Sequence, residues 1–266
     1  SLLRRLFGPR PTLIGGDGPI AAAIHDRLRR DGRAARRLAP DALTSSQLRR
    51  AETLILADPE DPSAAIAAVL ALAAGRSPRT PPLRLILAHR GPWSEGLEIP
   101  AADSPVRLEG LALEAQAARA LLAKHPLHAG CDPLYGQVPH LLIAGTAPPA
   151  LALLVEAMRL GHYGPDQAVF TLAADLPDAW RDAVLGAYPQ AQQCCRLRFT
   201  RLTDPDLGGA PPVTGVWVLI DPPKAGVDLA QALAALVLRH QGVAPPVYLE
   251  VGTARRMTFS RSARSG

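Results

Sequence analysis

Two glycines and an alanine near the start of the chain have the spacing of a nucleotide-binding loop. Gly16, Gly18 and Ala21 follow a short apolar run in the order Gly-x-Gly-x-x-Ala, and a helical pattern comes next. In such a loop the first glycine makes a tight turn, the second lets a pyrophosphate approach the backbone, and the third small residue lets helix and strand pack closely. We expect Asp17 and Pro19 to belong to the same loop. The free N–H groups at the helix start would attract the phosphates of NAD or another adenine nucleotide, and the charge of Asp17 works against this.

The acidic residue that should hold the ribose is missing from its usual place. A dinucleotide-binding fingerprint has an Asp or Glu about 20 residues after the glycines, at the end of the next strand. The sequence there reads RAARRLAPDAL, where Asp41 is the nearest carboxylate. Asp41 follows Pro40 and is expected to cap a helix over residues 42–50. The loop is therefore predicted either to bind a nucleotide weakly or to be vestigial and bind none.

The glycine loop recurs in the second half of the chain. Residues 16–32, GDGPIAAAIHDRLRRDG, align without gaps with residues 145–161, GTAPPALALLVEAMRLG, and each segment follows an apolar strand pattern. Gly145 aligns with Gly16, the first glycine of the loop. Ala147 and Pro149 narrow the approach, because a β-carbon obstructs a pyrophosphate and a proline has no N–H to donate. Gly145 is therefore a weaker candidate for cofactor binding than the first loop.

A second repeat follows each loop. Asp58 ends a predicted strand in the first half, and Asp221 ends a similar strand in the second half. Strands that alternate with helices in this way indicate a parallel sheet with right-handed crossovers. Between its two repeats the second half carries one more strand–helix–strand unit of roughly 30 residues. We predict an α/β protein of two tandem Rossmann-like, doubly wound units, residues 1–130 and 131–266. The first is shortened by one strand–helix unit, and its strand that should present the ribose acid is expected to be truncated.

Polar residues at the ends of strands are further candidates for a site. Ligands of open parallel sheets bind at the carboxyl ends of the strands, where Asp58, Asp221 and His89 are predicted to lie. We count Asp58 among the cofactor-binding candidates, as a carboxylate for a ribose or a cation. A turn that caps the next helix also accounts for Asp58, Asp61 and Asp221. His89 is expected to be a polar residue in a surface turn.

The composition excludes several classes of function. With 48% hydrophobic and 20% charged residues the chain is that of a globular protein, and no run approaches the ~20 apolar residues of a membrane span. The net charge of +5 comes from scattered arginines rather than a basic stripe, so no nucleic-acid binding is expected. The chain has three cysteines without a Cys-x-x-Cys pattern, and two of them, Cys194 and Cys195, lie in an apparent strand. This favours a reduced, cytoplasmic protein. The seven histidines are dispersed along the sequence, so no metal site is expected.

The repeated segments resemble the nucleotide-binding Rossmann domains of RCK type, which regulate potassium channels and Trk-type potassium uptake. The resemblance is carried by GDGPIAAAIHDRLRRDG and PDALTSSQLRRAETLILADPEDPSAAIAAVLALA in the first half, and by HLLIAGTAPPALALLVEAMRLGHYG, AYPQ and VTGVWVLIDPPKAGVDLAQALAAL in the second. It implies a tandem pair of NAD-binding domains that sense a ligand. It also implies a membrane channel or transporter segment as partner, in cis or in trans, and a place at the inner face of the membrane.

Catalysis has little support in the sequence. There is no Gly-x-Ser-x-Gly, Ser-x-x-Lys or His-Glu-x-x-His motif. The resulting interpretation is a non-catalytic, ligand-sensing regulatory module. One alternative is an NAD(P)-dependent oxidoreductase, for which two nucleotide units would leave no residues for a substrate domain. Another is a pure assembly scaffold. Helices expected in LEGLALEAQAARALLAKH and DLAQALAALVLRH are rich in Ala and Leu on more than one face, which favours a homo-oligomer or tight packing of the two halves.

Overall fold

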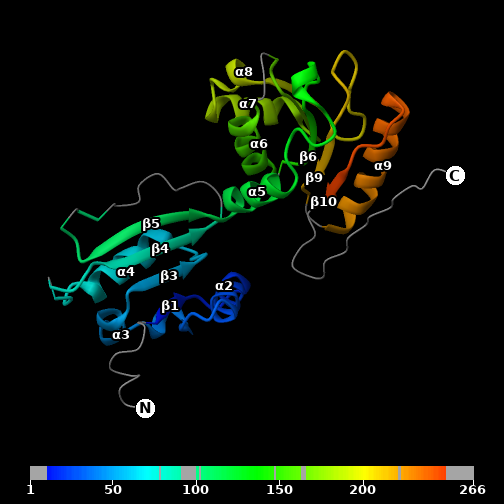
Figure 1. The fold of residues 1–266 in the computed structure, drawn as a ribbon. Coiled ribbons are helices and arrows are strands. Elements are labelled where there is room, and N and C mark those ends of the chain that lie inside the picture. Colours follow the sequence, from blue (N-terminus) through cyan, green and yellow to red (C-terminus); the bar gives the residue numbers. More distant parts are fainter. Residues whose placement is uncertain are drawn as a thin grey trace. The chain divides into compact units, whose positions relative to one another are not determined.

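Two compact units follow one another along the chain. The structure is a computed structural model that describes residues 11–77, 79–90, 100–101, 103–146, 148–162, 166–220 and 223–249. Internal contacts divide the chain into Ser1–Gln116 and Ala117–Gly266, so residues 117–130, expected in the first half, go with the second unit. Each unit is built on a five-stranded sheet whose neighbouring strands are parallel (Figure 1). The predicted α/β fold with two parallel-sheet units is confirmed.

The sheet of the first unit has the strand order β2-β1-β3-β4-β5. In chain order its elements are β1 (Thr12–Gly15), α2 (Pro19–Arg30), β2 (Ala35–Leu38), η1 (Pro40–Ala42), α3 (Ser45–Arg50), β3 (Thr53–Ala57), α4 (Pro62–Ala73), β4 (Leu83–His89) and β5 (Val106–Ala112). One buried apolar cluster joins α2 to the strands, and a separate one joins α3 and α4 to them, so helices pack on both faces. This is the strand order of flavodoxin-like sheets, whose ligands bind where the order reverses, between the first and third strands.

The sheet of the second unit has a different order, β10-β9-β6-β7-β8. Its elements are α5 (Leu113–Lys124), which begins in the first unit, η2 (Pro133–Tyr135), β6 (His140–Ala144), α6 (Pro148–Leu160), β7 (Val169–Ala174), α7 (Pro177–Ala187), α8 (Ala191–Cys194), β8 (Arg196–Arg201), β9 (Gly215–Val218), α9 (Pro223–Gln241) and β10 (Val247–Leu249). Counted from β6, the five strands follow the 3-2-1-4-5 order of dinucleotide-binding Rossmann sheets. Apart from β5 and β8, which each occur in one unit only among the described residues, the two sheets have the same strand order, β2-β1-β3-β4 in the first and β7-β6-β9-β10 in the second.

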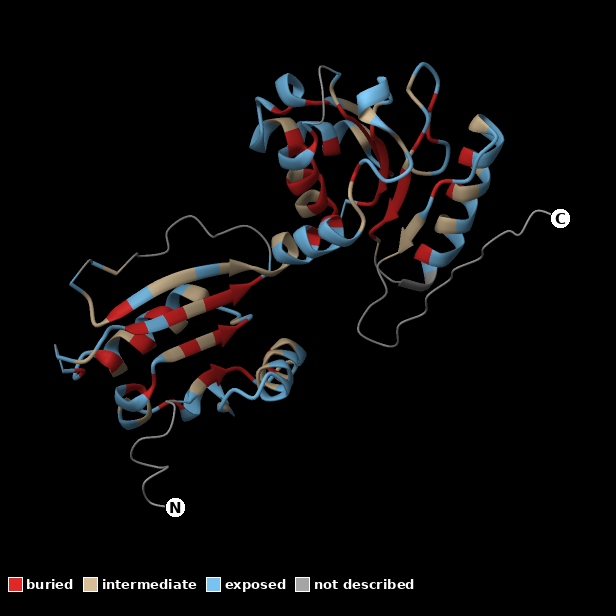
Figure 2. Cartoon of the chain, in the orientation of Figure 1, coloured by how far each residue is buried: buried red, intermediate tan, exposed pale blue. Residues whose placement is uncertain are grey.

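The core of the second unit lies along its three central strands. Every residue of β6, β7 and β9 is buried, and these strands are red throughout in Figure 2. Apart from His140 and Thr171 these strands are apolar at every position rather than alternating, which is typical of parallel strands covered by helices on both faces. Among the described helices of both units, none is long and apolar enough to cross a lipid bilayer.

The two glycine loops occupy the same place in their sheets. The Gly16 N–H donates to the carbonyl oxygen of Leu38 at the end of β2, at 2.9 Å, and the Gly145 N–H donates to that of Ala173 in β7, at 3.0 Å. Both glycines have positive φ angles, 146° and 117°. By this correspondence β2 is the second strand of its unit, and it pairs with β1 along all its residues. The strand expected to be truncated is thus short but present.

A strand that the sequence analysis did not predict completes the first sheet. As expected, the first unit has no counterpart of β8 among its described residues. It nevertheless has five strands, because β5 is added beyond β4 and pairs with it from Val106 to Ala112. Of these, residues 108–112 were expected to form the beginning of a helix. Pairing with β4 overrides that local preference, and the helix α5 starts only at Leu113, directly after the strand.

Two smaller expectations also change. The helix expected over residues 42–50 is shorter, because α3 begins at Ser45 and is capped by Thr44 rather than Asp41. Thr44 and Gln47 form a capping box, in which each side chain accepts from the other residue's backbone N–H, at 3.4 and 2.9 Å. Cys194 ends the short helix α8 and Cys195 precedes β8, so neither lies in a strand.

Candidate functional site

The loop between β1 and α2 brings the predicted glycines to the carboxyl end of the sheet. A β-carbon on Gly16 would lie 3.1 Å from both the β-carbon of Ala21 and the carbonyl oxygen of Ala57. Together with its positive φ, this close approach requires glycine at position 16. Ala21 is fully buried on the first turn of α2. The small residues thus let α2 begin immediately beside the ends of β1 and β3.

Gly18 leaves the start of α2 open. It is the N-cap residue, in an extended conformation, and no side chain caps the helix. A β-carbon on Gly18 would meet no atom of the described residues within 4 Å. The backbone N–H groups of Ile20 and Ala21, in the first turn of α2, donate no hydrogen bond to an acceptor among the described residues. Pro19 has no N–H to donate. Two unused donors at the positive end of a helix suit an anion such as a phosphate, and the exposed Asp17 opposes it.

The next strand of the sheet ends in a strained aspartate. Asp58 follows β3 with a φ angle of 53°, and it is the one non-glycine residue with positive φ among the described residues. Its N–H donates to the carbonyl oxygen of Ala88 at 2.7 Å, and its carboxylate lies 3.3 Å from the Arg90 Nε. A left-handed conformation costs a non-glycine residue about 1–3 kcal/mol and is frequent at functional sites. Helix α4 is instead capped by Asp61, whose carboxylate accepts from the N–H of Ala64 at 2.9 Å.

His89 was expected to lie in a surface turn, and this expectation is wrong. It is the last residue of β4 and only 6% exposed. Ala57 and Ala88 are register partners, so Asp58 and His89 follow side by side at the carboxyl ends of neighbouring strands. Asp58, His89 and Arg90 therefore stand at the same edge of the sheet as the glycine loop. Asp58 and His89 were predicted at the carboxyl ends of strands, and the pairing of β3 with β4 places them side by side. Arg90 was not predicted. Asp221 lies outside the described residues.

The described residues fit the phosphates of a dinucleotide better than its ribose. Strand β2 ends at Leu38, and the residues that follow are Ala39 and Pro40. The nearest carboxylate along the chain, Asp41, belongs to the short turn η1. A carboxylate that could accept a hydrogen bond from a ribose hydroxyl is thus absent from the end of this strand.

The second glycine loop is more closed. A β-carbon on Gly145 would collide with the carbonyl oxygen of Leu219, which follows β9. Helix α6 begins with Pro148 and Pro149, so two N–H groups are missing from its first turn. Asp175 directly follows β7 and is exposed. Ala147, which was expected to obstruct the approach, lies outside the described residues.

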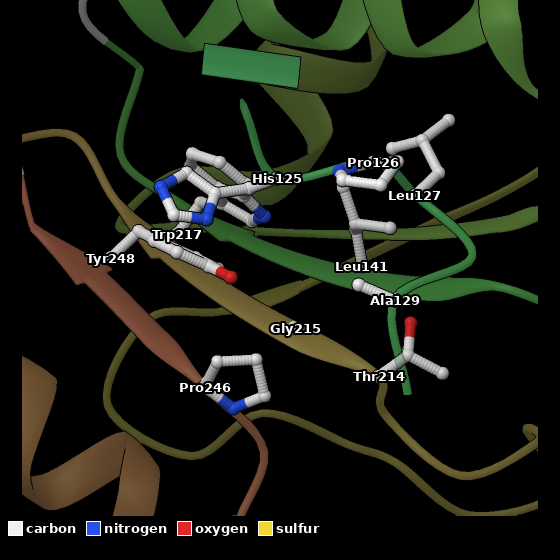
Figure 3. Close-up of a pocket in the computed structure, with 10 residues that line it drawn as sticks. All are labelled: His125, Pro126, Leu127, Ala129, Leu141, Thr214, Gly215, Trp217, Pro246 and Tyr248. Carbon is white, nitrogen blue, oxygen red and sulfur yellow. The ribbon is translucent and has the colours of Figure 1, made fainter. Parts of the chain in front are cut away.

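An aromatic cluster of the second unit lines a small cavity that is too small for a ligand. Tyr248 of β10 stacks on Trp217 of β9 with ring centroids 4.1 Å apart, and the ring of His125 lies 4.5 Å from that of Tyr248 (Figure 3). The cavity beside them has a volume of about 10 Å³, room for one water molecule. Burial, and secondarily the charge of Lys124, lowers the pKa of His125. The described residues contain no group of three or more His, Cys, Asp or Glu side chains that could hold a metal ion.

Comparison with known proteins gives likeness in fold only. No protein-family model matches the chain, and no curated protein sequence matches it. Similar solved structures include D-mandelate dehydrogenase from Rhodotorula graminis, with 13% identity and a TM-score of 0.28 over 94% of this chain and 84% of that one. A dipicolinate synthase subunit from Bacillus halodurans has 11% identity and a TM-score of 0.32 over 90% and 80%. A D-lactate dehydrogenase from Treponema pallidum has 12% identity and a TM-score of 0.27 over 90% and 78%.

These comparisons correct the expected function. The non-catalytic regulatory module of potassium transport is contradicted, because the similar structures are dehydrogenases and part of a synthase. The resemblance of individual segments to RCK-type domains stays a prediction. What the chain shares with these proteins is an α/β, Rossmann-like architecture.

Proposed function

We propose that this chain is an oxidoreductase-like protein that binds NAD or a related adenine dinucleotide at the β1–α2 loop of its first unit. The observation that carries the proposal is the open, uncapped start of α2 at Gly18. Phosphates would lie over residues 16–18, where the N–H groups of Ile20 and Ala21 are available and the helix dipole is favourable.

The geometry supports the first loop over the second. The first has one proline in its helix start and open space at Gly18. The second begins its helix with two prolines, and the carbonyl of Leu219 lies against Gly145. A proline removes a donor that a phosphate would use. The second unit has the strand order of dinucleotide-binding sheets. Its loop at Gly145 is therefore the competing site for the nucleotide.

An oxidoreductase needs a cofactor that carries a hydride and, beside it, a side chain that can move a proton. A bound nicotinamide would supply or accept a hydride. From the chain, Asp58 would orient Arg90, and the imidazole of His89 at the same edge could hold or move a proton.

Calorimetry with NAD, NADH, ATP and ADP tests the proposal. We expect weak binding with little preference among the four, because no acidic residue follows β2 to hold the ribose. Gly18→Val should abolish the signal, since its side chain occupies the space that the phosphates need. Gly186→Val in α7 is the matched control, because a β-carbon there also meets no described atom within 4 Å. It should leave binding intact.

Two results would contradict this proposal. Binding that survives Gly18→Val would place the nucleotide elsewhere, with the loop at Gly145 as the next candidate. No binding of any of the four nucleotides to the intact chain would favour a scaffold with two inactive loops.

A further inference from the structure

A cavity of the second unit lies at the amino-terminal ends of its strands, the opposite end of the sheet from Gly145. It has a volume of about 400 Å³ and opens beside Val169 and Arg196, the first residues of β7 and β8. Residues 209–211 also line it. A volume of this size is in the range of pockets that bind small molecules. Nothing in the nucleotide proposal uses this cavity.

Two arginines give the cavity a positive charge. Arg196 and Arg198 alternate along β8, so their side chains lie on the same face of this edge strand. Arg198 Nη2 donates to the carbonyl oxygens of Gly208, at 2.8 Å, and Asp206, at 3.3 Å. These carbonyls hold the guanidinium in place without cancelling its charge. The Asp206 carboxylate is 3.7 Å away and largely exposed, and Arg196 forms no ion pair with another described residue.

The other walls are neutral and held in place. Burial, with a smaller effect from Cys194, raises the pKa of the Cys195 thiol to about 12, so this wall adds no negative charge. The ring of His140 ties the loop to the sheet, with Nδ1 2.7 Å from the carbonyl oxygen of Pro211 and Nε2 2.8 Å from Thr171 Oγ1. A site whose walls are fixed before the ligand arrives loses little entropy on binding.

We propose that this cavity binds a small organic oxyanion, whose carboxylate or phosphate group lies against Arg196 and Arg198 and whose apolar part lies along Val169 and Pro211. Arginine suits such a group, because its guanidinium can donate two parallel, charge-assisted hydrogen bonds. The site is separate from the β1–α2 loop, so this inference does not depend on nucleotide binding.

Titration of the intact chain with inorganic phosphate and with benzoate, followed by amide NMR at constant ionic strength, tests the inference. We expect saturable shifts of the amides of Arg196 and Gly209 with at least one of the two probes. Saturation by benzoate alone would identify a carboxylate site, and saturation by phosphate alone a phosphate site. Arg196→Gln should weaken binding by about tenfold, the effect of losing one charge-assisted hydrogen bond.

The matched control is Arg201→Gln, because Arg201 is exposed on the same strand but does not line the cavity. It should change the affinity by less than about twofold. Equal losses in Arg196→Gln and Arg201→Gln would mean general attraction to a basic surface and would overturn the inference. So would the absence of saturable shifts with both probes. Gly18→Val should leave the titration unchanged, so failure of the nucleotide proposal stays distinguishable.

Discussion

At the scale of single residues, the carboxylate of Glu156 shows how a charge is accommodated inside the second unit. Its side chain is 5% exposed and accepts from Arg119 Nε at 2.8 Å, Arg119 Nη2 at 3.0 Å and Arg159 Nη1 at 2.8 Å. The hydrogen bonds from Arg119 do most to hold the pKa of Glu156 below its ordinary value. Because Arg119 is on α5 and Glu156 on α6, the pair also joins two helices.

We therefore expect Arg119→Met to lower the free energy of unfolding, since it leaves a buried carboxylate with one partner. Urea denaturation near neutral pH measures this. A carboxyl whose folded pKa is lowered stabilises the protein above its unfolded pKa, about 4.3, and the contribution is lost as the pH falls through the folded value. Arg181→Met is the control, because its partners Asp178 and Asp182 are exposed. An equal effect of the two substitutions would contradict the role of Glu156.

His140 predicts a dependence of stability on pH. The ring is fully buried, and burial lowers the pKa of His140, assisted by the charge of Arg198 and opposed by the hydrogen bond to Pro211. The folded state thus favours the neutral ring, so stability should be full above the unfolded pKa of about 6.5 and fall as the pH drops below it. His140→Gln keeps a donor and an acceptor but does not titrate. Thermal unfolding between about pH 7.5 and 5.5 should show a smaller decline in this variant; an identical decline would exclude His140 as its source.

At the scale of elements, the short helix α3 is held at both ends. Its start carries the capping box of Thr44 and Gln47. At its end, the buried guanidinium of Arg76 donates to the carbonyl oxygens of Leu48 and Ala51, where a cation also complements the helix dipole. A helix of this length is not stable alone, so these contacts and the burial of Leu48 define it.

Thr44→Ala should lower the free energy of unfolding by about 1 kcal/mol, because one N–H of the first turn loses its acceptor. Thr44→Ser, which keeps the hydroxyl, should restore most of it, and urea denaturation compares the two. Asp41→Ala tests the cap expected from the sequence. A larger loss in Asp41→Ala than in Thr44→Ala would mean that the structure assigns the cap to the wrong residue.

At the scale of the whole molecule, the second unit exposes apolar side chains in an ordered turn. Leu134 and Tyr135 of η2 are 90% and 84% exposed. The Asp132 carboxylate accepts from the N–H of Leu134 at 3.0 Å, and Gln137 accepts from the N–H of Asp132 at 2.7 Å, so hydrogen bonds define the turn. Exposed apolar patches often mark sites of protein association.

We expect the chain to form a homo-oligomer, as its Ala- and Leu-rich helices already suggested. Size-exclusion chromatography with light scattering measures the mass. Substituting both Leu134 and Tyr135 by Ser should shift an oligomer toward the monomer if this turn contributes to the interface. The same substitutions at Leu176 and Val243, which are also exposed, provide a control. A monomeric mass for the unaltered chain at all concentrations would contradict the prediction.

The sequence by itself determined those features of this protein that depend on neighbouring residues, namely its glycine turns and its alternation of strands and helices. It placed the turns at Gly16 and Gly145, because positive φ angles and close backbone contacts admit little but glycine there. It also indicated two parallel α/β sheets and the missing counterpart of β8, because alternating strands and helices leave a periodic pattern along the chain. These features depend on residues that are near one another in the sequence.

Tertiary structure alone decided the rest. Strand β5 forms where a helix was expected, and an ion pair joins Arg90 to Asp58, residues that follow two neighbouring strands of the first sheet. Each of these follows from which strands pair, and strand pairing joins segments that lie far apart in the chain. The local pattern of a strand is the same whichever neighbour it takes, so its place in the sheet, and any site formed there, is settled only when the chain packs.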